Sequence, residues 1–374
     1  MSNKWTFIDH ITDYLMRPRM GDLREPNHYP SEASCLVKDS AGDISVVGKC
    51  RRASVFRHVV ELTKYDPQKW GHLQSLADML VRKEIKPDRY LQWIWDAGNM
   101  YEEHIINYSK AAGVFISTQT PVYVPSHRIS GKIDLVIVNP QNGKLSIVES
   151  KSIYGHSIES VLGKDYWSKT ENKKMIKLGT PRDSNLMQIG LYQWWFASPR
   201  PEFENARLVY GARDTGVYGE FLVRINIDPT TGNMPIEYKQ VLPYESDWTD
   251  SGLTINSILK DGYEYVQRHI DSGLVPPRDF VLQYDDAKID KLYEADELSK
   301  VDREKYEKLK VVKLRARALA GETLTKEEQD LVDEYQGKRI KADQKPIEKG
   351  DWQCRLCQWR NVCYDQKTGK PTSV

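Results

Sequence analysis

Three charged side chains interrupt apolar stretches in the middle of the chain. Asp134 falls within the run 133–138, and Glu149 and Lys151 fall at the end of the run 145–151. A charge inside an apolar strand is costly unless it is paired or binds a metal. Glu149 and Lys151 are two residues apart, so they point to the same face of a strand. An acid beside such an acid–lysine pair is the set of groups that metal-dependent phosphodiester hydrolysis requires.

The residues around these charges predict a β-hairpin. Residues 131–138 and 145–151 are rich in β-branched side chains, and Pro140 with Asn142-Gly143 favours a turn between them. The hairpin would bring the acid of its first strand beside the acid and the lysine of its second.

Helices are predicted on both sides of this hairpin. The helix over 88–112 contains Glu102, and the helix over 184–197 contains Gln188 and Tyr192. Gln188 and Tyr192 are four residues apart, so they lie on one helix face. Strands and helices in this order predict an α/β fold with a mixed central β-sheet flanked by helices.

These motifs, taken in order, resemble the PD-(D/E)xK nuclease superfamily, and within it the RecB-like branch. The matching pieces are Gly98-x-x-x-Glu102, Ile133-Asp134, Glu149-Ser150-Lys151 and Gln188-x-x-x-Tyr192. Ile133 stands where the family name implies proline, and Glu102 stands where RecB-type members often have histidine. The resemblance implies a restriction-endonuclease-like core and nuclease activity.

The resemblance also implies a set of metal ligands. Glu102, Asp134 and Glu149, with the backbone carbonyl of Ser150, would bind Mg²⁺ or Mn²⁺ through hard oxygen atoms. The metal would lower the pKa of a bound water and neutralise charge on the scissile phosphate. The neighbouring residues 103–104 are the alternatives to Glu102 as the helix-borne ligand.

The remaining catalytic residues follow from the same resemblance. Lys151 would orient or deprotonate the water and stabilise developing charge. Gln188 and Tyr192 would hold that water and a DNA phosphate. The competing interpretation of the acid and lysine pattern is a surface salt bridge, because an isolated pattern of this length is weak evidence.

A basic, aromatic run lies in the polar connection 152–183. Its members are Lys164, Tyr166, Trp167, Lys169, Lys173, Lys174, Lys177 and Arg182. Charge and stacking together are typical of single-stranded DNA binding. The alternative is a solvated loop with no ligand.

Five cysteines stand at positions 35, 50, 354, 357 and 363. An odd number without a recognisable secretion signal argues against a disulfide framework, and the group of three argues for metal ligation. Many RecB-like nucleases close their domain with a [4Fe-4S] cluster held by one early cysteine and a C-x-x-C-x(5)-C run. The resemblance implies the ligands Cys50, Cys354, Cys357 and Cys363.

Two alternatives to this cluster remain open. Cys35 could replace Cys50 as the early ligand, although Cys50-Arg51-Arg52-Ala53 is more similar to the start of a helix in these enzymes. Zinc could replace iron and sulfur, because a C-x-x-C half-site suits both. One distant cysteine and a lone third cysteine fit the [4Fe-4S] cluster better than two compact zinc pairs.

Composition sets the class of protein. The chain has 374 residues, 40% hydrophobic and 29% charged, with a net charge of +1. It can bury a core, and a polyanion partner would need a local patch. The expectation is a cytoplasmic protein without membrane spans. The expected parts are a helical region over 1–112, a nuclease core over 113–286, an inserted charged helical hairpin over 287–341 and a cysteine segment over 342–374.

The predicted function is a metal-dependent DNA exonuclease acting on single-stranded or frayed ends, in recombination, repair, replication or CRISPR adaptation. The chain lacks a Gly-x(4)-Gly-Lys-Ser/Thr loop, so translocation would require a partner helicase. Its architecture also fits a phage enzyme. The alternatives are a structure- or sequence-specific endonuclease, and a DNA-binding or redox-sensing scaffold with a vestigial nuclease site.

Overall fold

The computed structural model describes most of the chain after residue 25. The described residues are 26–38, 43–86, 89–155, 157–168, 170–337, 340, 347 and 349–373. They divide into two compact units: residues up to Asp279 with Cys357–Cys363 and Ser373, and Phe280–Leu356 with Tyr364–Thr372. Among the described residues, no helix combines the length and apolar character that a bilayer crossing requires.

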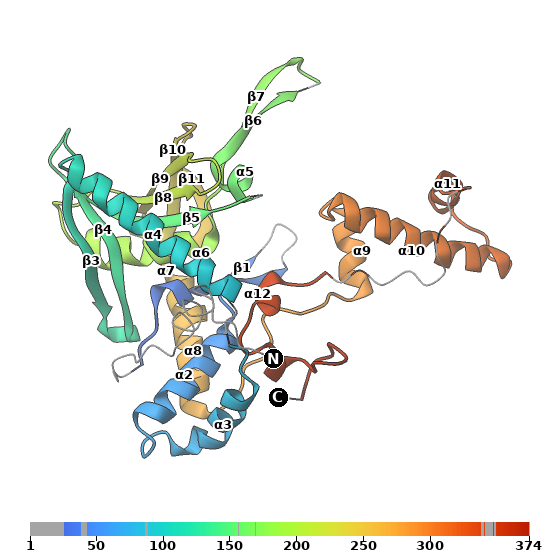
Figure 1. Cartoon of the computed structure of the whole chain (residues 1–374), viewed down its shortest axis with the longest axis horizontal. Coiled ribbons are helices and arrows are strands. Elements are labelled where there is room, and N and C mark those ends of the chain that lie inside the picture. The colour runs from blue at the N-terminus through green and yellow to red at the C-terminus, as the bar shows by residue number, and fades with distance from the viewer. Residues whose placement is uncertain are drawn as a thin grey trace, which may run out of the picture. The chain divides into compact units, whose positions relative to one another are not determined.

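A mixed seven-stranded sheet forms the centre of the first unit, as Figure 1 shows. Its spatial order is β11-β10-β9-β8-β5-β4-β3, and only the β5–β8 pair is parallel. The strands are β3 (Phe115–Val124), β4 (Ile129–Val138), β5 (Leu145–Ile153), β8 (Ala206–Ala212), β9 (Tyr218–Ile225), β10 (Pro235–Leu242) and β11 (Thr249–Thr254). The prediction of a mixed sheet flanked by helices is confirmed.

The predicted hairpin is β4 and β5, which pair antiparallel. Gly143 occupies the turn with a φ of +72°, a conformation that glycine adopts without a side-chain clash. The preceding strand, β3, contains Gln119 with a φ of +51°.

Two helices link the sheet to the predicted site residues. Helix α4 (Arg89–Ala111) packs against β5 and also contacts β3 and β4. Helix α6 (Asp183–Tyr192) continues into the π-helical turn η4 (Gln193–Ala197). It packs against the single turn η1 (Pro30–Glu32) and over β8 and β9. It lies in the crossover between the parallel strands β5 and β8, and its side chains from Leu186 to Tyr192 are buried.

A second helical layer completes the first unit. It contains α2 (Arg51–Tyr65), η2 (Gly71–Leu73), α3 (Gln74–Lys83), a continuous segment of α7 (Ile255–Ser257), η5 (Ile258–Glu264) and α8 (Tyr265–Ser272), and α13 (Arg360–Cys363). Apolar residues of α2, α3 and α8 form a core with Trp359 and Val362. Gly273 ends α8 in the left-handed conformation, as its position after the apolar pattern predicts.

The first unit also contains several short elements. Strands β1 (Ser34–Lys38) and β2 (Ile44–Gly48) form one small sheet, and η1 (Pro30–Glu32) and η3 (Pro125–His127) are single turns. The prediction of a polar connection over 152–183 is wrong. The chain instead forms α5 (Ser157–Leu162) and an antiparallel hairpin of β6 (Gly163–Ser168) and β7 (Lys173–Leu178), which projects from the central sheet (Figure 1).

The second unit is mainly helical. It contains α9 (Asp286–Glu294), α10 (Lys300–Leu319), α11 (Lys326–Glu334) and α12 (Trp352–Arg355). Ile289, Leu292, Leu298 and Ile347 form its buried core. The segment expected as two charged helices thus contains three among the described residues. Thr325 and Glu328 form a capping box at the start of α11, because each side chain accepts from the other's backbone N–H group.

Candidate functional site

The predicted acids meet where β4 and β5 separate. The backbone ladder of the hairpin ends at the pair Leu135 and Val148. One step further, the Ser150 N–H donates to Asp134 Oδ2 over 2.8 Å instead of to a strand carbonyl. The Ser150 hydroxyl donates to the same oxygen over 3.2 Å. Asp134 therefore holds the two strands together at the point where the site opens.

Glu149 is the most deeply buried of the three acids. Its exposure is 1%, and burial raises its pKa to about 8 even though Lys151 acts in the opposite direction. Lys151 Nζ lies 2.5 Å from Glu149 Oε1, whereas the buried Oε2 atom has no hydrogen-bond partner among the described residues. An unpartnered buried carboxylate oxygen is costly, so this atom is available for a cation or a proton.

Lys151 is cationic in this environment. Burial alone would lower its pKa, but the carboxylates of Glu149, Asp134 and Glu102 outweigh burial and raise the pKa of the lysine. Burial and the charge of Asp134 raise the pKa of Glu102 above its ordinary value, although Gln119 and Lys151 act in the opposite direction. These shared electrostatic interactions show that the helix-borne acid and the hairpin charges lie in one site.

Gln119 positions Glu102, and sequence reasoning missed it. Its side-chain amide donates to Glu102 Oε1 over 2.5 Å, from a strand position with positive φ. Positive φ at a residue other than glycine is a strained conformation that surrounding structure must hold in place. A single glutamine within a polar strand carries no periodic signal, so no sequence pattern indicates this role.

Tyr192 lies near the acids on the buried helix α6, and Gln188 of the same helix hydrogen-bonds with it. Burial raises the pKa of Tyr192, and the negative charges of Glu149 and Asp134 raise it further. The Tyr192 hydroxyl donates to the Lys132 carbonyl over 3.0 Å. The hydroxyl is therefore committed to the backbone of β4, and with 2% exposure Tyr192 braces the hairpin.

The three acids fit a hard cation in chemistry but are not drawn tightly together. Carboxylate oxygens suit Mg²⁺ or Mn²⁺, and Glu149 Oε2 lacks another partner. The oxygens of Glu102, Asp134 and Glu149 do not form a group within 4.8 Å of one another in the described structure. The three carboxylates therefore do not form a preassembled metal site in the described structure.

The structure brings three of the predicted cluster cysteines together. Cys50 is the N-cap residue of α2. Burial raises the pKa of its thiol, and interactions with Cys357 and Cys363 contribute to the increase. Cys357 and Cys363 pack against the helical core of the first unit. Cys354 lies in α12 of the second unit. Cys35 lies apart, 1% exposed in the core around the central sheet.

Charges of both signs lie near these thiols: after burial, Asp279 raises the pKa of Cys50, whereas two arginines lie beside Cys363. Arg278 donates twice to the Cys363 carbonyl, over 2.9 and 3.2 Å. Burial raises the pKa of the Cys363 thiol, and the charge of Arg52, which is 3% exposed, is the largest effect in the opposite direction. Thiolates that bind iron or zinc are negatively charged, so these two arginines favour the metal-bound form of Cys363.

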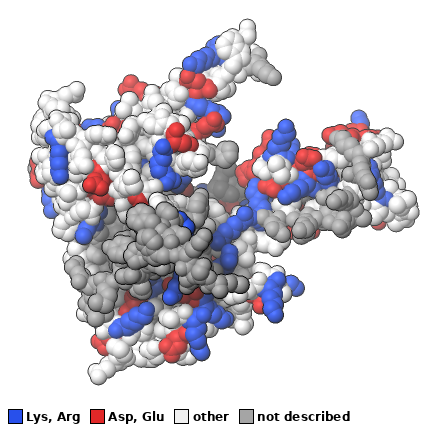
Figure 2. Space-filling model, viewed as in Figure 1, with Lys and Arg blue, Asp and Glu red and all other residues white. Residues whose placement is uncertain are grey.

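The predicted DNA-binding run lies mostly on the β6–β7 hairpin. Lys164, Lys173 and Lys174 are ion-paired with Glu159, Glu171 and Asp165 respectively, at 2.5–2.6 Å. Arg182 donates to the Ser157 hydroxyl over 2.6 Å, and Lys169 lies outside the described residues. On the face seen in Figure 2, cationic and anionic side chains are interspersed rather than gathered in one patch.

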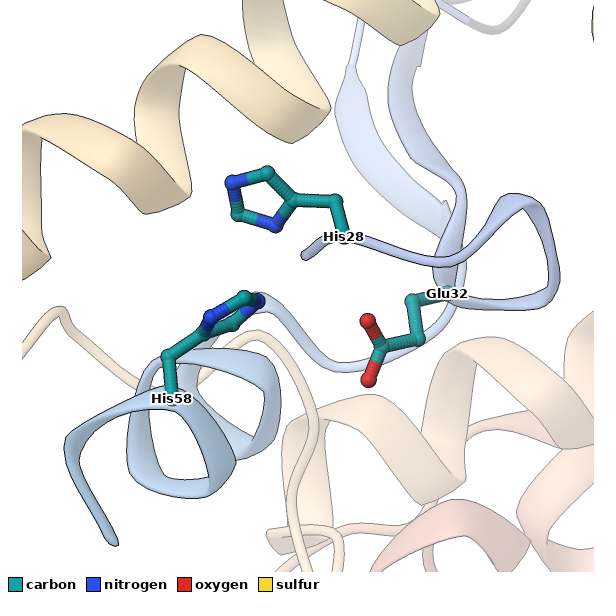
Figure 3. Close-up of side chains that lie close together, drawn as sticks. All are labelled: His28, Glu32 and His58. Atoms are coloured by element: carbon teal, nitrogen blue, oxygen red, sulfur yellow. The ribbon is translucent and has the colours of Figure 1, made fainter. Parts of the chain in front are cut away.

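A buried group that sequence reasoning missed is formed by His28, Glu32 and His58 (Figure 3). Their ligand atoms lie within 4.8 Å of one another, which suits a metal ion. Arg57 already supplies a cation there, donating to both Glu32 oxygens over 2.5 and 2.6 Å. Its Nη2 atom also lies 2.8 Å from His58 Nε2. We therefore interpret the group as a structural ion-pair network.

This network predicts a loss of stability in acid. Burial lowers the pKa of His28 to about 4, below its ordinary value of 6.5. Between these values the unfolded chain binds a proton that the folded chain does not, so stability falls as the pH falls from 6.5 to 4. Over this pH range we expect the free energy of unfolding to fall by about 3 kcal/mol more in wild type than in His28→Gln, measured by urea unfolding. His72→Gln, at an exposed position, is the control; an equal pH dependence in wild type and His28→Gln would contradict the prediction.

Three comparisons with known proteins found no match. No protein-family model, no curated protein and no solved structure matches the chain.

Proposed function

We propose that this chain is a metal-dependent DNA nuclease with a restriction-endonuclease-like core. The observation that carries the proposal is Glu149 Oε2, a buried carboxylate oxygen without a partner in the described structure. It lies in a site shared with Asp134 and a cationic Lys151. A purely structural ion pair would be expected to satisfy both oxygens of so deeply buried an acid.

Each side chain has a role in this proposal. Asp134 is oriented by its two hydrogen bonds from Ser150, and Glu149 is oriented by Lys151. Because Lys151 is charged, it is suited to stabilise negative charge on a phosphate rather than to remove a proton. Gln119 holds the carboxylate of Glu102 at the edge of the site.

A bound Mg²⁺ or Mn²⁺ would lower the pKa of a water molecule and neutralise charge on the scissile phosphate. Asp134 and Glu149 would hold it, with the Ser150 carbonyl as a further oxygen donor. Glu149 has a pKa of about 8, so it must lose a proton when it binds a cation near neutral pH.

The cysteines support a second part of the proposal. Cys50, Cys357 and Cys363, together with Cys354, would hold a [4Fe-4S] cluster that joins the start of α2 to the segment after residue 350. Support comes from the shared electrostatic environment of three of these thiols and from the arginines beside them. Its role would be to brace the helices of the first unit, and zinc is the alternative ion.

Digestion of labelled DNA tests the nuclease proposal. End-labelled linear single strands should be shortened progressively in Mg²⁺ or Mn²⁺, and EDTA should stop the reaction. Circular single strands should stay intact if the enzyme is an exonuclease, because it needs an end. Cleavage of circles would instead establish an endonuclease. Intact linear and circular DNA with either metal would contradict the proposed function.

A further inference from the structure

The β6–β7 hairpin has two chemically different faces. Its register pairs Lys164 with Lys177, Tyr166 with Met175 and Ser168 with Lys173. Directly opposed residues in an antiparallel pair share a face, and neighbours along a strand alternate between faces. We call the surface formed by these six residues the lysine–tyrosine face.

The opposite face is neutral and more apolar. It carries Trp167, Ile176 and Leu178, all exposed, together with Asp165 and Lys174. Asp165 Oδ2 and Lys174 Nζ lie 2.5 Å apart, so their charges offset each other. The one acid within the two strands therefore lies on this face, and the strand residues of the lysine–tyrosine face carry three lysines and no acid.

The charge of the lysine–tyrosine face is accessible. Lys164 and Lys173 pair with Glu159 and Glu171, which lie outside the two strands. Exposed ion pairs of this kind contribute little and exchange readily for a stronger polyanion. Lys177 is exposed and has no ion-pair partner among the described residues. Tyr166 is 43% exposed in the middle of these lysines.

The hairpin is rooted firmly in the central sheet. Gln240 of β10, which is 1% exposed, accepts from the Gly179 N–H over 2.9 Å. Its amide donates to the Leu162 carbonyl over 2.7 Å. One buried side chain therefore holds both ends of the hairpin. Because the hairpin is inserted between β5 and α6, its root joins the two elements that carry Glu149, Lys151 and Gln188.

We propose that the lysine–tyrosine face binds single-stranded DNA, with Tyr166 stacking on a base and Lys164, Lys173 and Lys177 contacting phosphates. The inference rests on the proposed nuclease function and names the part of the chain that holds its substrate. A lysine-flanked, exposed ring matches a single strand, because stacking requires an accessible base face. In a duplex the base faces are already stacked on one another.

Binding by an inactive variant tests the face. A fluorescein-labelled 20-nucleotide poly(dT) strand is titrated with Lys151→Ala protein, which also serves as the background for the hairpin variants. Tyr166→Ala should raise the Kd about 5- to 150-fold, the range that corresponds to the loss of one stacked base. Lys177→Gln should reduce the slope of log K against log salt by about 0.7, the contribution of one phosphate contact on a single strand. Ile176→Ala, on the opposite face, is the matched control and should bind as the background does.

Each outcome has a defined meaning. Unchanged affinity in Tyr166→Ala, or an equal loss in Ile176→Ala, would overturn the assignment of the face. Weaker binding by Trp167→Ala with no effect of Tyr166→Ala would assign binding to the opposite face and also overturn it. The substituted side chains of the hairpin are all exposed, so circular dichroism should show the same fold as the Lys151→Ala background.

A small substrate separates this inference from the nuclease proposal. Bis(p-nitrophenyl) phosphate is a phosphodiester without a strand of bases on which Tyr166 could stack, so wild type and Tyr166→Ala should hydrolyse it equally in Mn²⁺. If wild type hydrolyses the small substrate and Tyr166→Ala binds the strand with unimpaired affinity, the binding face is overturned but the proposed nuclease function is not. If strand binding depends on Tyr166 but wild type hydrolyses neither DNA nor the small substrate, the binding face is supported and the proposed nuclease function is overturned.

Discussion

Lys151→Ala is expected to lower the rate of DNA cleavage by about 10²–10³-fold or more, the usual effect of removing one preorganised electrostatic group. The lysine is the cation that faces Glu149, and it is held in its charged form by three acids. Its removal takes positive charge away from the point where phosphate charge would develop. Initial rates on end-labelled single-stranded DNA, at saturating Mn²⁺, provide the measurement.

Lys144→Ala is the matched control for this substitution. Lys144 lies in the exposed turn of the same hairpin, so its loss changes the net charge equally without touching the acids. Glu149 already has a raised pKa and can accept a proton when Lys151 is absent, so the fold should persist. Cleavage at the wild-type rate by Lys151→Ala would show that this site is not catalytic.

Cys50→Ser is expected to have the largest effect on stability. Anaerobically purified wild type should be brown with broad visible absorption, and this variant should lose the colour. Removing a bound structural metal group is one of the few single changes that cost about 4 kcal/mol or more. The free energy of unfolding and the iron content per chain should therefore fall together, measured by denaturant titration and by metal analysis.

Cys35→Ser provides the matched thiol-to-hydroxyl control. Cys35 is buried in the core around the central sheet and hydrogen-bonds with Ser257, so its substitution should leave the colour unchanged. Loss of colour in Cys35→Ser but not in Cys50→Ser would move the early ligand to Cys35. Colourless wild type containing stoichiometric zinc would contradict the iron–sulfur proposal while keeping a metal site.

The sequence predicted well the elements whose side chains repeat with a clear period. Both strands of the β4–β5 hairpin, helix α4 and helix α6 carry apolar residues at strand or helix spacing, and each lies within a few residues of its predicted position. The Thr325–Glu328 capping box was also predictable, because it depends on two residues three positions apart.

The β6–β7 hairpin was missed because its signal is different. Its residues are mainly polar and exposed, so no alternating burial pattern marks it as a strand pair. Its stability comes instead from backbone pairing and from Gln240, which lies more than sixty residues later in the chain. The His28 network was missed for a similar reason, since it joins separate segments through Arg57.

The sequence by itself determined which chemical groups are available: three acids, a lysine and a cysteine set, each attached to a recognisable element. Only the tertiary structure decided their state. The separation of β4 from β5 frees the Ser150 N–H for Asp134, and complete burial raises the pKa of Glu149 while leaving its second oxygen unpartnered. Burial and strand separation depend on packing between distant segments, which local patterns do not encode.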